Sequence, residues 1–360
     1  MRIGLDVTQT VKRDGRGIAR YIRSVTPYLG QADPSLDLSI YIRGSRWWRR
    51  HLINDWMPSV KRSWLAVPDL LIPTNLDLFH SFGNHLPAIS SVPRTFTIHD
   101  FRALDRSWDE AGTGNRLRRN IERSQGIICL TNHGKSRLLE HSPNYSEANI
   151  SVIAHGVDHE YFCPQTSEVK NDVRKKYGLD RPFLLQLGSW FPHKNIELSI
   201  RAFSQSRAFK DGFNLVFVGG GASSDYRKSL QALAQSNGVE DSLVWIESVP
   251  GADLPGFLGA AHCLLQPSRY EGFALPLLEA MAVGIPGVVS SASCLPEVSA
   301  GIWPIVGLDD VEGFALAIDS MALDETLRIE KIVAGMKHAG SFTWEKTAEQ
   351  TADFFKKVLS

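Results

Sequence analysis

Short apolar runs alternate with amphipathic segments along the whole chain of 360 residues. The runs RIGLDV at residues 2–7, FLLQLGS at 183–189 and AHCLLQPS at 261–268 are typical of buried β-strands. Apolar residues at helical spacing predict helices between such runs, for example at residues 195–209 and 224–237. Strands that alternate with helices indicate an α/β fold built on parallel sheets. The other strand-like runs are LDLSIYI, LDLFHSF, RTFTIHD, GIICLT, NISVIA, NLVFVGGG, LVWIES and IPGVVSSA.

The chain length predicts two domains, since single hydrophobic cores stop growing at about 250–300 residues. The polar, proline-containing stretch at residues 158–176 is the best place for the crossing between them. Open parallel sheets bind ligands beyond the carboxyl ends of their strands. We therefore expect two Rossmann-like sheets that face each other across a ligand-binding cleft.

The composition describes a globular chain that is neutral overall, with 43% hydrophobic and 22% charged residues. Residues 1–160 hold 21 basic and 16 acidic side chains, which leaves 18 basic and 23 acidic side chains for the rest. The chain thus has a basic half and an acidic half. This split supports two domains and suggests that the first meets an anionic partner.

The four cysteines, Cys129, Cys163, Cys263 and Cys294, are scattered and form no C-x-x-C pair. We expect buried free thiols in a reducing compartment rather than a metal site or disulfides. The start MRIGLDVTQT lacks the apolar run of a signal peptide, and no uncharged apolar stretch reaches the roughly 18 residues that span a bilayer. The sequence therefore predicts a cytoplasmic protein.

Two glutamates, Glu271 and Glu279, lie on either side of Pro276 in YEGFALPLLEAMA. Pro276 suits the first turn of a helix, because its missing N–H has no intrahelical partner there. Free amides at that helix start would favour a diphosphate, while Glu279, near the first turn, could bind a ribose diol and Glu271 could orient sugar hydroxyls. The alternative is that both glutamates merely complement the helix dipole. The amides belong to Gly272, Phe273, Ala274 and Leu275.

A second loop, LGSWFPHKN, carries His193 and Lys194 ahead of Asn195. Asn195 is a good N-cap, so the two basic side chains should lie beside the positive end of a helix. A cation there can neutralise the charge that develops on a departing diphosphate. We favour this function over a solvated lysine in a surface loop, because the loop follows a predicted parallel strand.

The first half of the chain offers weaker candidates for a ligand site. Gly15 and Gly17 precede an amphipathic helix and would let the backbone approach a ligand, but Arg20 stands where the dinucleotide-binding fingerprint needs its third glycine. His99 ends a strand, where an imidazole can bind sugar hydroxyls or phosphate oxygens or can be structural. Asp100 could orient that imidazole or contact an acceptor.

Basic residues and tryptophans interleave between Arg43 and Trp64. Tryptophan rings suit the headgroup level of a bilayer and cations attract anionic lipids, so this segment could bind a membrane surface. The alternative is a solvated basic helix with one tryptophan face in the core. We find no nucleic-acid-binding motif and expect no such partner. The residues concerned are Arg43, Arg46, Trp47, Trp48, Arg49, Arg50, Trp56, Lys61, Arg62 and Trp64.

Taken together, the motifs resemble the retaining glycosyltransferase family 4 over nearly the whole chain. VIAHGVDHEYFCP resembles the family's interdomain segment, LGSWFPHKN its VGTLEPRKN loop, and PSRYEGFALPLLEAMAVGIPGVVSS its E-x7-E region, with Glu271 and Glu279 at the required spacing. SFTWEKTAEQTADFF resembles the C-terminal helix. The resemblance implies a GT-B fold, with an acceptor-binding domain at residues 1–165, a nucleotide-sugar-binding domain at 166–344 and a helix at 345–360 that packs back on the first.

The resemblance also implies roles for individual residues. Lys194 would contact the donor diphosphate and Glu279 the ribose, while Glu271 and His99 would act at the donor sugar or phosphate. The glycine loop at residues 15–17 would close over the diphosphate, and Asp100 would meet the acceptor. The implied catalytic residues are Glu271, His99 and Lys194; the implied donor-binding residues are Gly15, Gly17, Ser189, His193, Lys194, Gly272, Phe273, Ala274, Leu275 and Glu279.

The implied reaction is transfer of a hexose from a nucleotide-sugar, with retention of anomeric configuration and without a bound metal. Retention would arise by same-face attack assisted by the leaving phosphate. We expect GDP-mannose as the donor, with UDP- and dTDP-sugars open, and a glycan acceptor, lipid-linked, in polysaccharide, O-antigen or exopolysaccharide biosynthesis. The enzyme would work in the cytoplasm, on the inner face of the cytoplasmic membrane if the Arg43–Trp64 segment binds lipid.

Three departures from the family pattern qualify these expectations. His193 stands where arginine is usual, which would make diphosphate binding weaker or pH-dependent. Ala154 and His155 replace a common Pro-Asn pair, a change that we expect to be harmless, and VSAGIWPIV lacks the frequent Gly-Asp-Ala sequence. Two other classes of protein stay open: a GT-B epimerase that hydrolyses its nucleotide-sugar, and a non-catalytic sugar-nucleotide-binding subunit.

Overall fold

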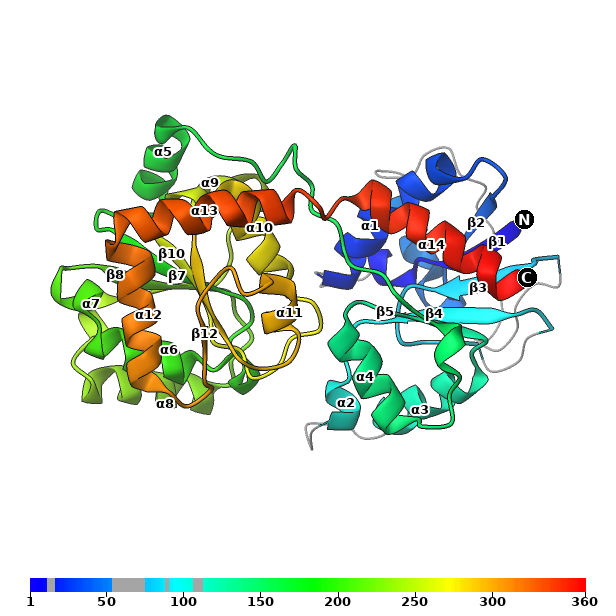
Figure 1. Ribbon diagram of the computed structural model, residues 1–360, viewed down its shortest axis with the longest axis horizontal. Helices are drawn as coiled ribbons and strands as arrows, with labels where there is room; N and C mark the ends of the chain where they lie inside the picture. The colour runs from blue at the N-terminus through cyan, green and yellow to red at the C-terminus, as the bar shows by residue number, and fades with distance from the viewer. Residues whose placement is uncertain (12–16, 54–74, 88–90, 106–112) are drawn as a thin grey trace. The chain divides into compact units, whose positions relative to one another are not determined.

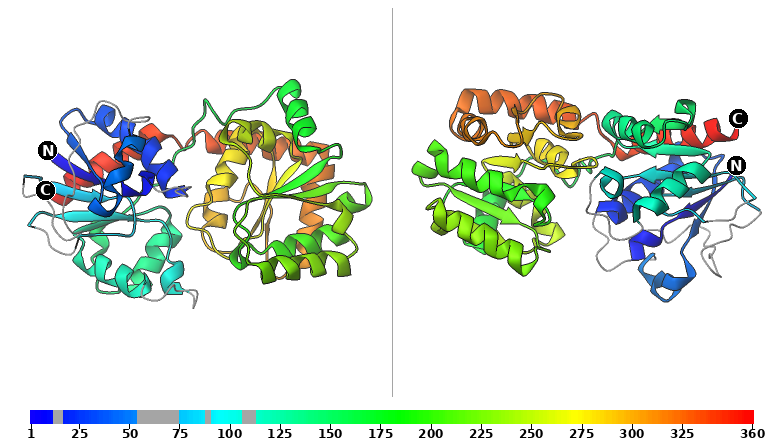
Figure 2. Two further views of the ribbon diagram at one scale, coloured as in Figure 1. Left: turned by 180° about the vertical axis from the view of Figure 1, so that it is seen from behind. Right: turned by 90° about the horizontal axis from the view of Figure 1, so that it is seen from below.

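The computed structural model describes residues 1–11, 17–53, 75–87, 91–105 and 113–360. It divides into two compact units, a first unit of Met1–Gly156 with Phe342–Ser360 and a second unit of Val157–Ser341. Each unit has a six-stranded parallel sheet with helices on both faces (Figures 1 and 2). The predicted α/β fold with two parallel sheets is therefore confirmed. The chain passes from the first unit to the second after Gly156, which is earlier in the sequence than the expected boundary at residues 165–166.

The sheet of the first unit has the strand order β2-β1-β3-β4-β5-β6, and each neighbouring pair is parallel. Its strands are β1 (Arg2–Asp6), β2 (Asp37–Tyr41), β3 (Leu78–Ser81), β4 (Arg94–Ile98), β5 (Gly126–Cys129) and β6 (Ile150–Val152). Its helices are η1 (Thr8–Val11), α1 (Gly17–Ala32), η2 (Gly44–Ile53), α2 (Arg102–Asp105), α3 (Thr113–Arg123), α4 (Asn132–His141), η3 (Glu147–Asn149) and α14 (Trp344–Leu359).

Helix α14 brings the end of the chain back to the first unit, where it packs along α1 (Figure 1). Ala348 and Phe355 lie on its buried face, and burial of a phenylalanine contributes about 1.5–3 kcal/mol. A side chain at Gly156 would place its Cβ 2.3 Å from the backbone nitrogen of Trp344. Only glycine therefore permits this close approach between α14 and the chain after β6.

The sheet of the second unit has the order β12-β11-β10-β7-β8-β9, again all parallel. Its strands are β7 (Phe183–Leu187), β8 (Asn214–Val218), β9 (Leu243–Ile246), β10 (Cys263–Gln266), β11 (Gly287–Ser290) and β12 (Ile305–Val306). Its helices are α5 (Ser167–Tyr177), η4 (Pro192–Lys194), α6 (Ile196–Gln205), α7 (Arg207–Lys210), α8 (Ser224–Ser236), η5 (Glu240–Ser242), η6 (Gly251–Asp253), α9 (Leu254–Ala260), α10 (Leu275–Val283), α11 (Leu295–Ser299), α12 (Val311–Leu323) and α13 (Glu325–Ala339).

Three local predictions in the second unit are corrected. The helix expected at residues 195–209 is interrupted at Ser206, whose extended backbone and side chain cap α7. Part of the polar stretch expected to be the crossing forms α5, because Thr166 caps its start and Gly178 ends it in the left-handed conformation. Strand β12 was not predicted, since two residues are too short to show a pattern.

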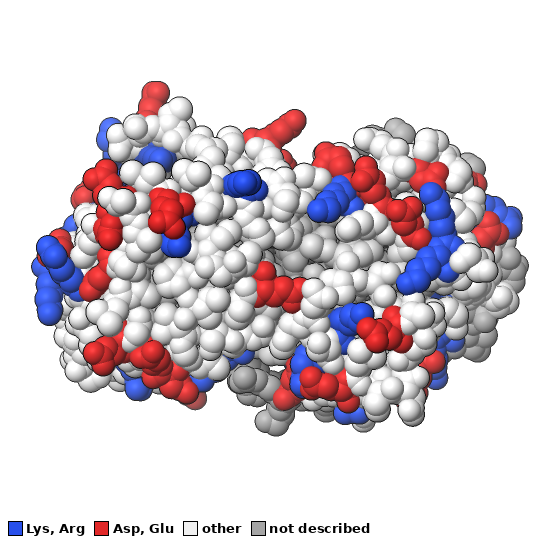
Figure 3. Space-filling model, viewed as in Figure 1, with Lys and Arg blue, Asp and Glu red and all other residues white. Residues whose placement is uncertain are grey.

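The charge asymmetry along the chain does not produce a single-sign patch on the face shown in Figure 3. Acidic and basic side chains are interspersed there over the surface of each unit. In the part of the chain that the structure describes, no helix combines the length and the apolar character needed to cross a membrane.

Candidate active site

The second unit brings two predicted site residues together at the point where its strand order reverses. From β7 the chain proceeds to β8 and β9 on one side, while β10, β11 and β12 follow on the other side. Lys194 follows β7 and Glu271 follows β10, and these strands are neighbours in the sheet. Such a reversal at the carboxyl ends of parallel strands is where open α/β sheets bind ligands.

The loop after β7 positions Lys194 through backbone contacts. The carbonyl of Lys194 accepts a hydrogen bond of 2.8 Å from the Gln186 side chain, which anchors the loop to the end of the strand. Next to this loop, Gly219 has φ 146°, and a Cβ there would lie 1.9 Å from the carbonyl oxygen of Gly188. Glycine is therefore required for the loops after β7 and β8 to pack against each other.

Asn195 connects the Lys194 loop to the loop after β10, which corrects its expected role as a side-chain N-cap. It adopts the left-handed conformation at φ 52°, and its side chain makes no capping hydrogen bond. Its amide instead donates to the carbonyls of Pro267 at 3.2 Å and Leu308 at 3.1 Å. The side chain thus fastens together three segments that surround the Lys194 site.

Glu271 contacts Lys194 directly. Lys194 Nζ lies 2.6 Å from Glu271 Oε1, and the two side chains are only 17% and 11% exposed. The same oxygen accepts hydrogen bonds from Ser268 Oγ at 2.7 Å and Gln266 Nε2 at 3.1 Å. In the second unit, which is described throughout, these interactions all fall on Oε1. No described residue of this unit donates a hydrogen bond to the second oxygen, Oε2.

These neighbours determine the ionisation of Glu271. Burial is the largest single influence and raises the pKa of the carboxyl, but the Lys194 charge and the hydrogen bonds from Lys194, Ser268 and Gln266 together hold the pKa below its usual value. Glu271 is therefore a carboxylate at neutral pH. Such a group accepts hydrogen bonds and balances Lys194, but it has no proton to give as a general acid.

Glu279 lies deeper than its sequence position suggests. It is the fifth residue of α10, so it starts the second turn, and the residue is only 2% exposed. Pro276 occupies the first turn, as the sequence predicts. Glu271 precedes the helix, so the two glutamates do not form a stacked pair on one helix face.

The start of α10 is an open helix end. Ala274 is the N-cap in the left-handed conformation, and its side chain cannot accept a hydrogen bond from the first amides. The first amides of the helix come directly after Gly272 and Phe273. The loop that carries these residues is held in place at the main chain of Glu271. Ser293 Oγ donates to the carbonyl of Glu271 at 2.6 Å and accepts from its N–H at 3.3 Å. The helix end therefore offers donors and positive potential to an anion beside Lys194.

Residues with a left-handed backbone conformation are concentrated around this site. The structure describes four non-glycine residues with positive φ, and three of them lie on loops at the carboxyl ends of β7, β10 and β11. These three are Asn195, Ala274 and Ser293. Such conformations cost about 1 kcal/mol or more each and persist where the surroundings enforce them, which is common at binding sites.

The other residues of the second unit that were expected to bind the donor lie on the same loops. His193 is buried, and its carbonyl accepts a 2.7 Å hydrogen bond from the Arg269 backbone N–H. Its ring stacks against Phe191 at a centroid distance of 5.9 Å. Ser189 follows Gly188 and is partly exposed, and Leu275 is the first residue of α10.

The first unit presents a predicted site residue at the carboxyl end of β4, the strand next to β3 in its sheet. His99, at the end of β4, is partly exposed, and its Nε2 lies 2.7 Å from the carbonyl oxygen of Phe82. Because a carbonyl only accepts, Nε2 carries a proton. Burial lowers the pKa of His99, and the hydrogen bond to Phe82 and the charge of Asp100 offset only part of that effect. The neutral ring therefore has an acceptor at Nδ1.

His99 belongs to an aromatic cluster with two more histidines. Tyr21 stacks on His155 at 4.5 Å between ring centroids, and the His99 ring lies 5.3 Å from Tyr21. His80 is fully buried between Thr95 and Thr97, at 2.9 and 3.2 Å. Burial is the main cause that lowers the pKa of His80 to about 3. Burial likewise holds the pKa of His155 well below its usual value.

Asp100 and Gly17 belong to the first unit, whereas Lys194 belongs to the second. The Asp100 carboxylate accepts hydrogen bonds from the Arg102 guanidinium at 3.1 and 3.2 Å. Among the described residues, its hydrogen-bonding partner is therefore Arg102 and not His99. Gly15 lies outside the described residues. Gly17 begins α1, and a Cβ there would meet no atom within 4 Å.

Sequence reasoning missed several polar residues at the sheet edges. Asp6 ends β1, is buried, and forms a 3.0 Å ion pair with Arg43. Ser268, Gln266 and Ser293 orient Glu271. A polar residue at the end of an apolar run, as in RIGLDV and CLLQPS, was the available signal. The partners of these residues depend on strand order, which no local pattern reveals.

Only part of the expected membrane-binding segment is described. In η2, Trp48 is 60% exposed, and the guanidinium carbon of Arg49 lies 4.2 Å from its ring centroid. The side chain of Trp47 and residues 54–74, with Trp56, Lys61, Arg62 and Trp64, lie outside what is described. Arg43 pairs with Asp6 rather than facing a lipid surface.

Comparisons with known proteins agree with this arrangement. Residues 169–332, which carry Lys194, Glu271 and Glu279, match the family model of the glycosyl transferases group 1. The chain is 27% identical over 241 residues to O-antigen chain mannosyltransferase B of Escherichia coli, which is 67% of this chain and 62% of that protein. It is 29% identical over 222 residues to a GDP-mannose-dependent alpha-(1-6)-phosphatidylinositol monomannoside mannosyltransferase of Mycolicibacterium smegmatis, at 59% and 54% coverage.

The fold is shared with solved structures of much lower sequence identity. The Anabaena protein Alr3699/HepE in complex with UDP superposes with a TM-score of 0.76 at 15% identity and covers 99% of each chain. The likeness in fold extends over both units, and the sequence match to the family lies within the second. The chain has the GT-B fold, and its residues 169–332 match the glycosyl transferases group 1, a family of sugar-transferring enzymes.

Proposed function

We propose that the chain transfers a hexose, with mannose as the first candidate, from a nucleoside-diphosphate sugar to a glycan, and that the anomeric configuration is retained. The Lys194–Glu271 pair at the strand-order reversal of the second unit carries this proposal. It joins a cation and an oriented carboxylate beside an open helix N-terminus. A sugar diphosphate needs that combination, because it presents anionic oxygens next to hydroxyl groups.

In this proposal the second unit holds the donor. Lys194 and the amides at the start of α10 neutralise the diphosphate, and Glu271 accepts a hydrogen bond from a sugar hydroxyl through Oε2. Glu279 binds the ribose diol through a carboxylate that α10 holds in place. His193 and Ser189 lie on the same loop as Lys194 and complete the contacts to the diphosphate.

The first unit holds the acceptor in this proposal, with Asp100 near it, and His99 offers Nδ1 to a sugar hydroxyl. The bond from the anomeric carbon to the diphosphate oxygen breaks while the acceptor oxygen bonds to the same face of the sugar. The acceptor proton passes to the leaving phosphate, so no enzymic base is needed. Lys194 stabilises the charge that develops on that phosphate. We further propose that no metal is required, which activity in the presence of EDTA would test.

The relatives' names support mannose and GDP as the first donor to test. One relative is named an O-antigen chain mannosyltransferase, and another is named as GDP-mannose-dependent and acts on a phosphatidylinositol mannoside. These names also support a lipid-linked glycan as acceptor and polysaccharide assembly as the setting. The chain matches only about half to two thirds of the length of these relatives.

A ligand panel tests the donor. Thermal unfolding with GDP-mannose, UDP-glucose and dTDP-glucose should show the largest rise in midpoint for GDP-mannose, since a ligand stabilises the state that binds it. Calorimetry with the Glu279→Gln variant should then show weaker binding of both GDP-mannose and GDP. Unchanged affinity in that variant would remove Glu279 from the ribose role.

Product analysis separates transfer from the other two functions. Incubation of GDP-mannose with and without a lipid-linked glycan should give acceptor-dependent release of GDP and a longer glycan. Release of GDP with free sugar in the absence of acceptor would indicate an epimerase or hydrolase instead. Binding without any release, with every acceptor, would indicate a non-catalytic subunit.

A further inference from the structure

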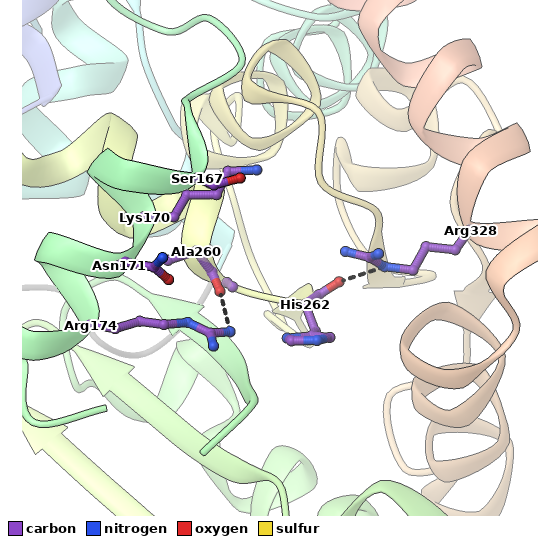
Figure 4. Close-up of a pocket in the computed structure, with 9 residues that line it drawn as sticks. Ser167, Lys170, Asn171, Arg174, Ala260, His262 and Arg328 are labelled. Carbon is purple, nitrogen blue, oxygen red and sulfur yellow. Dashed lines mark hydrogen bonds between the residues drawn. The ribbon is translucent and has the colours of Figure 1, made fainter. Parts of the chain in front are cut away.

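A cavity of about 220 Å³ lies in the second unit at the amino end of β10, away from Lys194 and Glu271 (Figure 4). The residues before β10 form its floor, and Glu271 follows the same strand at its other end. Helices α5 and α13 supply side chains from opposite sides. The residues that matter are Lys170, Asn171 and Arg174 from α5, Ala260 and His262 before β10, and Arg328 from α13.

Two guanidinium groups are held in this cavity by backbone carbonyls. Arg174 Nη2 donates to the carbonyl of Ala260 at 3.2 Å, and Arg328 Nε donates to the carbonyl of His262 at 3.3 Å. Figure 4 shows the two side chains reaching this segment from opposite sides. Each guanidinium has five N–H donors, so one bond to a carbonyl fixes the group and leaves other donors for a ligand.

The cavity has a charge imbalance that distinguishes it from the rest of the second unit. Lys170, Arg174 and Arg328 line it, and no carboxylate does. Elsewhere in this unit, which is described completely, basic residues such as Lys176 and Lys194 pair with carboxylates at 2.7 and 2.6 Å.

No carboxylate lies within 4.0 Å of the basic groups of Lys170, Arg174 and Arg328 in this unit. Glu325, one turn earlier on α13, acts on Arg328 only at longer range.

The lowered pKa of His262 is consistent with a positive potential inside the cavity. Burial, followed by the charges of Arg328 and Arg174, lowers the pKa of its imidazole to about 4. Burial also lowers the pKa of Arg328. The site thus concentrates positive charge in a partly buried place without a counter-ion from the protein, and an anion would remove that electrostatic cost.

We propose that this cavity binds a small oxyanion, the phosphate group of inorganic phosphate or of a phosphorylated metabolite. The planar guanidinium group of arginine can donate two parallel hydrogen bonds to the oxygens of a phosphate. Asn171 and Ser167 add neutral donors at the rim of the cavity. The volume is below the roughly 300 Å³ of typical sites for larger ligands, which suits a phosphate group with a few waters. This site is separate from the proposed donor site and does not depend on glycosyl transfer.

Calorimetry with sodium phosphate, against sodium chloride at the same ionic strength, tests the site without any donor present. Phosphate should bind the wild type and raise its unfolding midpoint. The Arg174→Gln plus Arg328→Gln variant should weaken phosphate binding at least about tenfold, because two charge-assisted contacts are lost. Lys175→Gln, an exposed neighbour on α5, is the matched control and should bind phosphate as the wild type does.

The donor site is also built for anions, so a second control separates the two. The Lys194→Gln variant should retain phosphate binding with an affinity close to wild type. The proposal is overturned if Lys194→Gln abolishes phosphate binding while the double arginine variant keeps it, or if phosphate binds no better than chloride. The affinity for glucose 1-phosphate, compared with that for inorganic phosphate, then distinguishes a phosphate ester from free phosphate as the ligand.

An NMR titration of His262 in the wild type avoids the risk that the double variant misfolds. Bound phosphate should raise the pKa of this imidazole from about 4, because an anion beside Arg174 and Arg328 offsets their repulsion of the proton. The His262→Gln variant identifies the ring signal. A His262 titration that is identical in phosphate and chloride would overturn the proposal.

Discussion

In the first unit, His80, His99 and His155 lie among aromatic rings, and burial keeps their imidazoles neutral. In the second unit, the strands end at the switch point with a cation and a carboxylate 2.6 Å apart, oriented by polar neighbours. The two sheets have the same parallel architecture. The difference teaches that the fold specifies where a ligand can bind, and the residues on the loops decide which chemistry it meets.

The described hydrogen bonds that position the site residues also differ between the two edges. In the second unit, Asn195 and Ser293 connect the loops after different strands through side-chain hydrogen bonds. In the first unit, the carbonyl of Phe82 positions His99. A preorganised charged edge suits the part of the reaction in which charge develops, and we assign that part to the second unit.

The largest expected effect comes from Lys194. Replacement by glutamine in Lys194→Gln should lower kcat about 100- to 1000-fold, as the loss of an electrostatic group at a developing charge does in other enzymes. It should also destabilise the fold, because Glu271 would be left largely buried without its cation. Steady-state kinetics and thermal unfolding measure the two effects.

The double variant Lys194→Gln plus Glu271→Gln separates catalysis from stability. It should recover most of the unfolding midpoint, since no charge remains unpaired, and it should stay inactive. Recovery of activity in the double variant would show that the pair is structural and would contradict its assignment to the donor.

The second effect concerns the rigidity of the charged edge. Asn195→Ala should destabilise the chain by about 2–3 kcal/mol, because two hydrogen bonds to buried carbonyls are lost and alanine disfavours the left-handed backbone. Asn195→Gly loses the same bonds but tolerates that conformation, so it should cost about 1 kcal/mol less. Urea unfolding of the two variants checks the difference. Equal values would mean that the backbone conformation carries no strain here.

The third effect is a difference in acid sensitivity. His80 has a pKa of about 3 in the folded chain against 6.5 normally, so the unfolded state takes up a proton first. Stability should therefore fall as pH drops below about 6.5, by about 1.4 kcal/mol per pH unit for this histidine. The lowered pKa of Glu271 contributes stability that is complete above about 4.5 and is lost only as pH falls through its folded pKa.

Urea unfolding between pH 7.5 and 5.5 thus measures the buried histidines with a lowered pKa, which include His262 of the second unit, and a variant of His80 separates its contribution. The His80→Gln variant should show a shallower fall in unfolding free energy than the wild type over that range. Glu271→Gln should shift the free energy without changing its slope there. Parallel lines for the wild type and His80→Gln would contradict the neutral, buried state of His80.

The smallest expected effect concerns the proposed membrane surface. The variant Trp48→Ala plus Arg49→Glu should reduce co-sedimentation with vesicles of phosphatidylglycerol and phosphatidylethanolamine by about fivefold or more, since each basic residue near an anionic surface contributes about 1 kcal/mol. Arg181→Glu, an exposed site in the second unit, is the control for charge alone and should bind as the wild type does. Equal loss in both variants would show that the effect is not local to η2.

The sequence by itself determined the parallel α/β class, nearly all of the strands and the two loops that carry Lys194 and Glu271. These features depend on local patterns: apolar runs of strand length, helical spacing, and a proline at a helix start. The same patterns placed Glu271 before α10 and Glu279 within it. The resemblance to glycosyltransferases rested on motifs in these loops, and the match of residues 169–332 bears it out.

Only the tertiary structure decided which residues meet. Strand order places the loops after β7 and β10 side by side, so that Lys194 and Glu271 share one site although 77 positions separate them. The same long-range pairing turned Asn195 from a helix cap into a link between loops, and it buried Glu279. It also brought α5 and α13 to the amino end of β10 and so created the basic cavity. Contacts of this kind depend on packing between distant segments, which no local pattern of residues encodes.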